Sequence, residues 1–307
     1  MKSPSLNLSI ALAALFLAAC GGTPTQKSPT PISAGSANAD ELAASALLTW
    51  GNDRGKAPQA LGQVQRAVQS APQRPELLWL YLRLCADTAT CEAEVVEAQL
   101  RKLDPGSGAV WLGALTRAQA RNDSRTEDQI LEVMGKSAHF NVYWTTLIAQ
   151  LTPPISRSPV ASSVAQPTPT PVTNALNMSI EYLSRLTTPA FTALSTACDA
   201  RHVREPDRRV RCERISRILQ GSDTTLAEGL GLGIAQRVAL PSSTAVMQIT
   251  AKINTLSYQN QTAGTVVASQ VEKDKFSDQM LKLMARLDRE QEVSKAILRW
   301  AGRPLQP

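Results

Sequence analysis

The fold of this chain is decided at residues 103–123, which read LDPGSGAVWLGALTRAQARND. Asp104-Pro105-Gly106 stops one helix and opens the next unit, because proline interrupts the hydrogen-bond ladder of a helix. Trp111-Leu112-Gly113 then provides the packing surface of a helix, and Asn122-Asp123 provides a turn. The stretch therefore predicts a helix that turns directly into a second helix.

Three tryptophans reveal a period of about this length. Trp79, Trp111 and Trp144 are 32 and 33 residues apart (111 − 79 and 144 − 111), and each lies near the start of the first helix of a predicted pair. A helix–turn–helix unit of this length resembles the tetratricopeptide family. The resemblance implies an all-α fold of helical hairpins stacked as a TPR-like α-solenoid, with the three tryptophans in equivalent buried positions of the repeat core. The alternative is an irregular helical bundle in which the tryptophan spacing is chance.

Helical patterns continue on both sides of this stretch. Residues 40–151 are predicted to hold the TPR-like repeats, and residues 175–307 a helical continuation with a basic hairpin and a long C-terminal helix over 272–301. Only 4% of the residues are aromatic, which favours helices over a β-sandwich. Within residues 92–103 the spacing predicts one buried stripe formed by Val95, Val96, Leu100 and Leu103.

Residues 152–174 interrupt the helical pattern. They contain six prolines among serine, threonine and valine, and this composition favours polyproline over helix. We expect the segment to be disordered, either as a linker between domains or as an insertion within one helical hairpin. The insertion is favoured, because residues 141–151 then find a partner helix in residues 176–186.

A longer correspondence joins the two halves of the chain. Cys91-Glu92 is followed by Leu100, Asp104 and Leu112-Gly113, and Cys212-Glu213 is followed in the same way by Leu219, Asp223 and Leu230-Gly231. Cys85 and Cys198 precede them as the corresponding partners. The second half is therefore predicted to repeat the architecture of the first.

The N-terminal segment, residues 1–19, has the order of a bacterial lipoprotein signal peptide. Lys2 and an apolar run precede Leu17-Ala18-Ala19-Cys20, and the run is too short to span a bilayer. We expect cleavage between Ala19 and Cys20, acylation of Cys20, and a disordered tether over residues 20–39, which are rich in Gly, Pro, Ser and Thr. An ordinary secretory signal with an incidental Cys20 is the alternative.

The chain resembles the helical lipoproteins of Gram-negative bacteria. The resemblance implies a cell-envelope protein that is anchored to the lipid bilayer through acylated Cys20. Gly21 after the cysteine is consistent with export to the outer membrane, with the protein facing the periplasm.

Four cysteines remain, which is an even number in an oxidising compartment. Three pairings are open, and the short spacings favour local disulfides Cys85–Cys91 and Cys198–Cys212, each across the loop of a helical hairpin. A metal site is disfavoured, because the chain has two histidines and no CxxC or HExxH motif. No metal or other cofactor is expected.

The formal net charge of +6 arises in the C-terminal half. Residues 20–150 carry 12 Lys and Arg against 13 Asp and Glu, whereas residues 151–307 carry 19 against 13. Seven arginines lie close together, facing only Glu205, Asp207 and Glu213: Arg201, Arg204, Arg208, Arg209, Arg211, Arg214 and Arg217. They are interpreted as a solvated helix face, with contact to anionic lipid or lipopolysaccharide as the alternative. Nucleic acid is disfavoured, because no aromatic residue lies among them.

The motifs of catalytic sites are missing from the sequence. Gly229-Leu-Gly-Leu-Gly233 lacks the GxGxxG spacing and a preceding strand, so its glycines are interpreted as helix-packing residues. There is no GxSxG, and paired carboxylates such as Glu290 and Glu292 are explained by surface pairing with nearby lysines and arginines. No catalytic residue is therefore assigned.

By elimination, the sequence favours binding over catalysis. We expect a membrane-anchored, periplasmic helical-repeat scaffold for a protein or peptide partner, as the tetratricopeptide resemblance implies. One alternative is a cell-envelope enzyme, for example one that acts on peptidoglycan, built on a helical scaffold. The other is a structural envelope protein that contacts anionic lipid or lipopolysaccharide. Buried carboxylates with shifted pKa values in a deep cleft would favour the enzyme, and a shallow groove would favour the scaffold.

Overall fold

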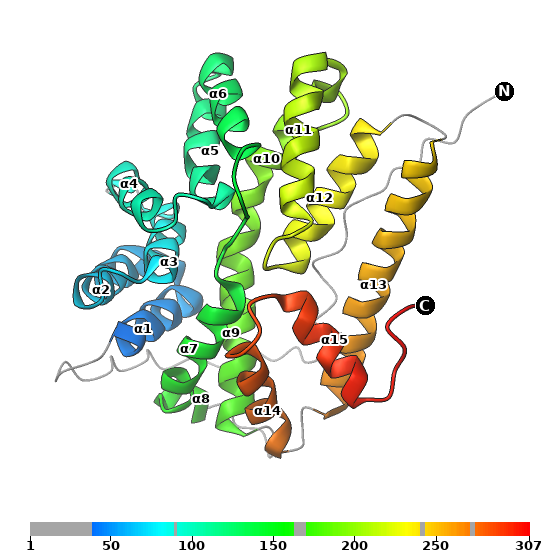
Figure 1. The fold of residues 1–307 in the computed structure, drawn as a ribbon. Coiled ribbons are helices and arrows are strands. Elements are labelled where there is room, and N and C mark those ends of the chain that lie inside the picture. The colour runs from blue at the N-terminus through cyan, green and yellow to red at the C-terminus, as the bar shows by residue number, and fades with distance from the viewer. Residues whose placement is uncertain (1–38, 89–90, 163–169, 240–242, 271–273) are drawn as a thin grey trace.

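A computed structural model describes residues 39–88, 91–162, 170–239, 243–270 and 274–307. Within these ranges the chain is helical and contains no β-strand (Figure 1). A single isolated bridge joins Ser107 and His139. The all-α fold predicted from the sequence is therefore confirmed.

The helices form the following series along the chain. They are α1 (Ala39–Asn52), α2 (Ala57–Ser70), α3 (Pro75–Cys85), α4 (Ala93–Leu103), α5 (Leu112–Ala120), α6 (Ser124–Met134), α7 (Trp144–Ser156), α8 (Pro159–Ser162), α9 (Pro171–Thr187), α10 (Thr192–Ala197), α11 (Pro206–Leu219), α12 (Thr225–Val238), α13 (Thr244–Gln270), α14 (Asp274–Met284) and α15 (Glu290–Trp300). Short 3-10 helices are η1 (Arg54–Lys56), η2 (Gly108–Trp111), η3 (Thr188–Phe191) and η4 (His202–Arg204).

Successive helices pair as hairpins. α1 packs on α2, α3 on α4, α5 on α6, and α11 on α12. Local sequence explains several of the helix starts: Pro75 and Pro206 occupy first-turn positions that need no hydrogen-bonding N–H, and the Asp123 side chain accepts a hydrogen bond from the N–H of Thr126 at the start of α6. The turn predicted at Asn122-Asp123 is therefore observed.

The hairpins do not pack only on their neighbours in sequence. α7 packs against α1, α14 packs against α7, and the pair α5–α6 lies beside the pair α10–α11 (Figure 1). In a solenoid each repeat contacts only the adjacent repeats. Here the hairpin α7–α9 lies between the two halves of the sequence and contacts both.

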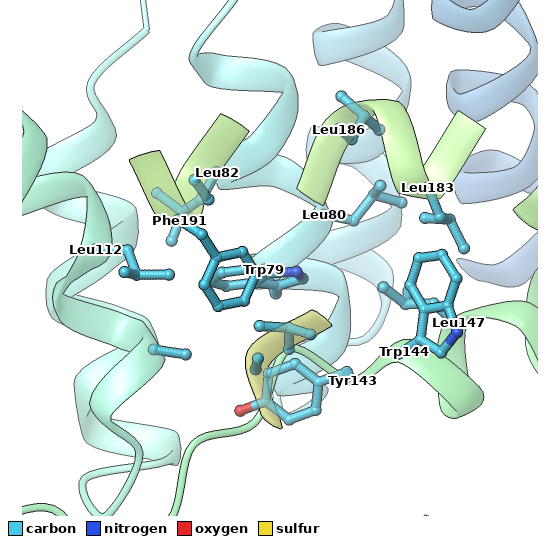
Figure 2. Packing of buried hydrophobic residues seen from close by; sticks show 14 of the residues in the cluster. Trp79, Leu80, Leu82, Leu112, Tyr143, Trp144, Leu147, Leu183, Leu186 and Phe191 are labelled. Atoms are coloured by element: carbon cyan, nitrogen blue, oxygen red, sulfur yellow. The ribbon is translucent and has the colours of Figure 1, made fainter. Parts of the chain in front are cut away.

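The large buried side chains meet around this hairpin. Figure 2 shows Trp79 and Phe191 close together near Leu82 and Leu112, and Trp144 beside Leu147 and Leu183. These residues come from α3, η3, α5, α7 and α9. One continuous hydrophobic cluster therefore connects elements that are far apart in the sequence.

The proline-rich segment differs from the expectation. Residues 152–156 complete α7 with Pro153 and Pro154 in its last turns, residues 159–162 form α8, and Pro171 begins α9 after the N-cap Thr170. Prolines near a helix end or in the first turn remove few hydrogen bonds, so the prediction of a disordered segment was wrong for these residues. Residues 163–169 lie outside the described residues. α7 and α9 pack along each other, which is the pairing that the insertion interpretation expected.

The prediction of one long helix over residues 272–301 was also wrong. The chain leaves the helical path between Met284 and Glu290, so that α14 and α15 are separate helices. Glu290 forms hydrogen bonds at the start of α12, and this tertiary contact fixes the start of α15 independently of α14. Trp300, at the end of α15, is 51% exposed.

The predicted stripe on α4 is correct only in part. Leu100 is buried and Val96 and Leu103 are half-buried, whereas Val95 is 61% exposed. Glu97, which the apolar pattern passes over, is buried instead because it pairs with Arg117 of α5. The spacing of apolar residues cannot predict that a charged residue is buried in an ion pair.

Candidate functional site

Both predicted disulfides are observed. Cys85 pairs with Cys91, with the two Cα atoms 5.4 Å apart, and Cys198 pairs with Cys212, with the two Cα atoms 5.7 Å apart. Cys85 ends α3 and Cys91 lies two residues before α4, whereas Cys198 directly follows α10 and Cys212 lies within α11. The cysteines therefore have a structural role.

The three tryptophans occupy different environments. Trp79 lies inside α3 and is 1% exposed, Trp144 is the first residue of α7 and is buried, and Trp111 ends η2 and is half-buried. The Arg83 guanidinium lies 4.5 Å from the ring centre of Trp79, and that of Arg101 lies 4.6 Å from the ring centre of Trp111. The equivalence expected from the 32- and 33-residue spacing is therefore not seen in their burial.

Three of the seven clustered arginines are engaged across the contact between α6 and α11. Arg208, only 5% exposed, lies 2.6 Å from Glu127 and 2.8 Å from Asp128. Arg211 lies 3.1 Å from Asp128, and Arg214 lies 3.2 Å from Glu132. The expectation that only carboxylates of the same segment face the cluster was wrong, because α6 supplies three more.

The other four arginines remain at the surface. Arg201, Arg204, Arg209 and Arg217 are exposed. Arg201 pairs with Asp199 at 3.4 Å, and Arg217 pairs with Glu213 at 3.3 Å, one turn away on α11. Solvated pairs of this kind contribute little to stability.

A second cluster of polar groups holds the segment between His139 and Trp144. The N–H groups of Val142 and Trp144 donate to the two carboxylate oxygens of Asp223, each at 3.0 Å. The Tyr143 hydroxyl donates to Asp104 at 2.5 Å, and His139 lies 2.9 Å from the same carboxylate. Tyr143 adopts a left-handed backbone with φ of 59°, which turns the chain directly into α7. Two aspartates from different halves of the sequence thus hold one segment.

The Asp223 carboxyl is buried, and burial raises its pKa to about 6 despite the stabilising N–H donors of Val142 and Trp144. The neighbouring Glu290 accepts hydrogen bonds from the N–H and hydroxyl of Thr225, both at 2.8 Å, and so caps α12. Burial and the charge of Asp223 raise the pKa of Glu290. The interpretation of Glu290 as a surface-paired residue was therefore wrong.

The glycine-rich run lies within α12, and only one of its glycines is in tight contact. A Cβ atom on Gly231 would lie 2.7 Å from Leu219 Cβ and 2.8 Å from the Ser216 carbonyl oxygen, so α12 approaches α11 closely there. The corresponding Gly113 of α5 meets only side-chain atoms, those of Glu97 and Arg117. The helix-packing interpretation holds for Gly231.

Two hollows of the described surface are open grooves. One, of about 580 Å³, lies between α6 and α11 and is lined by Ser124, Arg125, Asp128, Gln129, Glu132, Val133 and Arg211. The other lies along α4 and is lined by Glu94, Val95, Ala98, Gln99 and Lys102. Asp223 and Glu290, whose pKa values are raised, line neither groove.

Two features are absent from the part of the chain that the structure describes. It contains no group of three or more His, Cys, Asp or Glu side chains arranged to hold a metal ion. None of its helices combines the length and the apolar character needed to cross a bilayer. Ala19, Cys20, the signal segment and the tether through residue 38 lie outside the described residues.

Sequence reasoning missed the residues that organise the interior. Asp223 and Glu290 were noted only as part of a repeat pattern or a charged helix, and Tyr143 was not singled out at all. Ser222-Asp223-Thr224-Thr225 before a helical pattern is a capping signal that could have located Asp223. No sequence signal indicates that its carboxylate also binds a segment 79 residues earlier.

Comparison of the chain with protein-family models, with curated proteins and with solved structures found no match in any of the three.

Proposed function

We propose that this chain is a lipid-anchored, periplasm-facing scaffold that binds a protein or peptide partner and performs no catalysis. The observation that carries the proposal is the separation of two carboxylates with raised pKa values, Asp223 and Glu290, from the surface grooves. Asp223 accepts hydrogen bonds from the N–H groups of Val142 and Trp144, and Glu290 accepts one from Thr225 at the start of α12. The grooves carry mixed surface charges. Small-molecule sites are enclosed and mostly apolar, whereas open polar grooves suit macromolecular contacts.

The groove between α6 and α11 is the surface we assign to the partner. It combines Arg125, Gln129 and the half-exposed Val133 with the ion-paired Asp128 and Arg211. The finer part of the proposal is that the consecutive hairpins α1–α2, α3–α4 and α5–α6 stack in a TPR-like manner, which the packing of α2 on α3 and of α4 on α5 supports. The groove then lies where the last of these hairpins meets α11.

Photo-crosslinking in intact cells tests this assignment. A photoreactive residue replaces Val133 in the groove, and the control carries it at Val210, a similarly exposed valine of α11 that does not line the groove. We expect one discrete protein adduct from position 133 only. The added substitution Arg125→Glu should weaken that adduct, and Arg201→Glu should leave it unchanged. Equal adducts from positions 133 and 210 would contradict the groove as the binding site.

Anchoring is tested separately at Cys20. The proposal expects that the full chain incorporates labelled fatty acid and that Cys20→Ser remains an unprocessed, unlabelled precursor. Label in the Cys20→Ser chain would show that the lipid is attached elsewhere. This result does not depend on whether a partner binds the groove.

A second candidate is contact with anionic lipid or lipopolysaccharide through Arg201, Arg204, Arg209 and Arg217, which stay exposed. The engagement of Arg208, Arg211 and Arg214 with α6 leaves fewer cations for such a surface. If lipid is the ligand, replacing the four exposed arginines with glutamine abolishes binding to anionic vesicles. Under the scaffold proposal, these replacements leave the adduct at position 133 intact.

A further inference from the structure

The two disulfides differ in how far solvent reaches them. Cys198 and Cys212 are both 0% exposed, and Cys85 is 5% exposed. Cys91 is half-buried, so it is the one paired cysteine with appreciable surface. Thiol–disulfide exchange requires an attacking thiolate to reach a sulfur atom, so a fully buried disulfide reacts only after the structure around it opens. Only the Cys85–Cys91 bond therefore offers an approach in the folded protein.

The surroundings of Cys91 are also open. Glu92, Glu94 and Val95, which follow it at the start of α4, are exposed, and Figure 1 shows α4 at the outer edge of the molecule. Cys212 lies inside α11 on the same face as the buried Ser216, four residues further along. The partner helices of α11 therefore cover this sulfur, whereas Cys91 lies at the surface end of its hairpin.

Surface charge acts in the opposite direction. Glu92 and Glu94 near Cys91 repel an approaching thiolate, and Arg209 and Arg211 near Cys212 attract it. Such charges are screened over about 8 Å at physiological ionic strength, and they only change the concentration of thiolate at the surface. They cannot provide a path to a buried sulfur. Access therefore determines which bond reacts first.

The two ends of the Cys85–Cys91 bond are held very differently. Eight of the 11 residues of α3, which ends at Cys85, are buried, whereas α4 has two buried residues among 11, Glu97 and Leu100. α4 packs mainly on α3, with further contacts to η2 and α5. Opening the bond is therefore expected to loosen α4 and to leave α3 in place.

We propose that Cys85–Cys91 is a site of reversible thiol exchange that loosens α4 when it is reduced, while Cys198–Cys212 stays closed in the folded protein. A thiolate of a dithiol reductant attacks Cys91 Sγ, the bond between the two cysteines breaks, and Cys85 leaves as a thiolate that takes up a proton. The second thiol of the reductant then attacks the mixed disulfide and releases Cys91, which is protonated in turn. The protein gains two electrons and two protons, and the reductant becomes a disulfide.

The same geometry allows the bond to form again. The Cα atoms of Cys85 and Cys91 are 5.4 Å apart, which is within the usual range for a disulfide, so an oxidant can restore the bond once α4 returns to α3. Loosening of α4 changes the hollow lined by Glu94, Val95 and Lys102. The inference goes beyond the proposed scaffold function and does not depend on it.

Reduction of the folded, oxidised full chain by dithiothreitol at neutral pH provides the first test. Samples are alkylated with N-ethylmaleimide over time, and peptide mapping assigns the label to each cysteine. We expect Cys85 and Cys91 to be labelled at least about tenfold faster than Cys198 and Cys212. In strong denaturant, where access no longer differs, this preference should disappear. Equal rates in the folded chain, faster labelling of Cys198 and Cys212, or no labelling of Cys85 and Cys91 would overturn the proposal.

Amide hydrogen exchange of the full chain tests the response of α4. After selective reduction, the amides of α4 should exchange at least about tenfold faster and those of α11 at an unchanged rate, and reoxidation should restore the slow exchange. The pair Cys85→Ser and Cys91→Ser should reproduce the reduced pattern. The matched pair Cys198→Ser and Cys212→Ser should leave α4 unchanged. Equal exchange of α4 in the oxidised and reduced chains would overturn the proposal.

Discussion

Two regions of the molecule share a local frame but are stabilised differently. The unit α3–α5 and the unit α10–α12 each have a disulfide between the first and second helices, an aspartate after the second helix, and a glycine where the third helix meets the second. In the first unit Trp79 fills the interior, and Glu97 pairs with Arg117 within the unit. The second unit has no tryptophan, and its Arg208 pairs with Glu127 of α6.

The two aspartates extend the same contrast. Asp104 binds the side chains of His139 and Tyr143, whereas Asp223 binds the backbone N–H groups of Val142 and Trp144. The two units therefore share their disulfides and the glycines at their helix contacts. The side-chain contacts that stabilise each unit differ, because they depend on the neighbouring helices. Two units with similar backbone arrangements can therefore be stabilised by different side-chain contacts.

The largest expected effect concerns the tryptophan of the first unit. Trp79→Ala should lower the free energy of unfolding by about 4 kcal/mol, because it removes a fully buried aromatic side chain. Trp111→Ala should cost about 1–2 kcal/mol, since its side chain is half-buried. Urea unfolding measures both, and Trp300→Ala, at an exposed site, is the control. Equal losses for Trp79 and Trp111 would instead favour equivalent repeat positions.

The second largest effect is the difference between Asp104 and Asp223 in the unfolding free energy lost on substitution by alanine. Asp223→Ala leaves the buried N–H groups of Val142 and Trp144 without acceptors and should cost about 3 kcal/mol. Asp104→Ala removes the contact to the exposed His139 side chain and the acceptor of the Tyr143 hydroxyl, but leaves no buried backbone N–H without an acceptor, and should cost about 1–2 kcal/mol. The measurement is again urea unfolding at neutral pH. If Asp104→Ala costs as much as Asp223→Ala, the distinction between backbone and side-chain partners is wrong.

The pH dependence of the unfolding free energy tests the raised pKa of Asp223. Its pKa rises from 3.8 to about 6 on folding, so the folded protein binds the proton more tightly than the unfolded chain. Its contribution to stability is present in full below pH 4 and is lost as the pH rises through 6, by up to about 3 kcal/mol. Asp223→Asn removes this titration.

The quantity to compare is the change in unfolding free energy between pH 4 and pH 7 in the two proteins. Other carboxyls contribute equally to both, apart from Glu290, whose pKa the charge of Asp223 helps to raise. The unsubstituted chain should lose more stability over this interval than Asp223→Asn. Parallel pH profiles would contradict the assignment of the shift to Asp223.

The smallest expected effect is the difference between the two disulfides. Cys198 and Cys212 are 14 residues apart and Cys85 and Cys91 are 6 apart, so the longer loop restricts the unfolded chain more. Chain-entropy arguments give about 3 kcal/mol for the longer loop and about 2.4 kcal/mol for the shorter one. Paired Cys→Ser variants, compared by thermal unfolding, should follow this order. The reverse order would indicate that contacts with neighbouring helices dominate the disulfide effect.

Local signals in the sequence predicted local structure well. The turn at Asn122-Asp123 and both disulfides depend on interactions within about one hairpin, and all are observed. The errors at Pro153 and Val95 have a common cause. The cost of a proline depends on where the helix ends, and the burial of an apolar residue depends on whether another helix covers it.

The organising contacts of the candidate site lay beyond sequence reasoning for a different reason. The pairing of Arg208 with Glu127 joins residues 81 positions apart, and the binding of Trp144 to Asp223 joins residues 79 apart. Charge counts along the chain show neither pairing. Only the packing of α6 against α11, and of α7 between the two halves, brings these groups together.

The segment from His139 to Trp144 has a consequence for how the molecule comes apart. In a linear array of repeats an end can fray while the rest stays folded, because each repeat relies only on adjacent ones. Here Asp104 and Asp223 hold the same few residues, and those residues begin α7. Unfolding of either half releases that segment and removes a support of the other. The chain should therefore lose its structure cooperatively, in one transition that includes both halves.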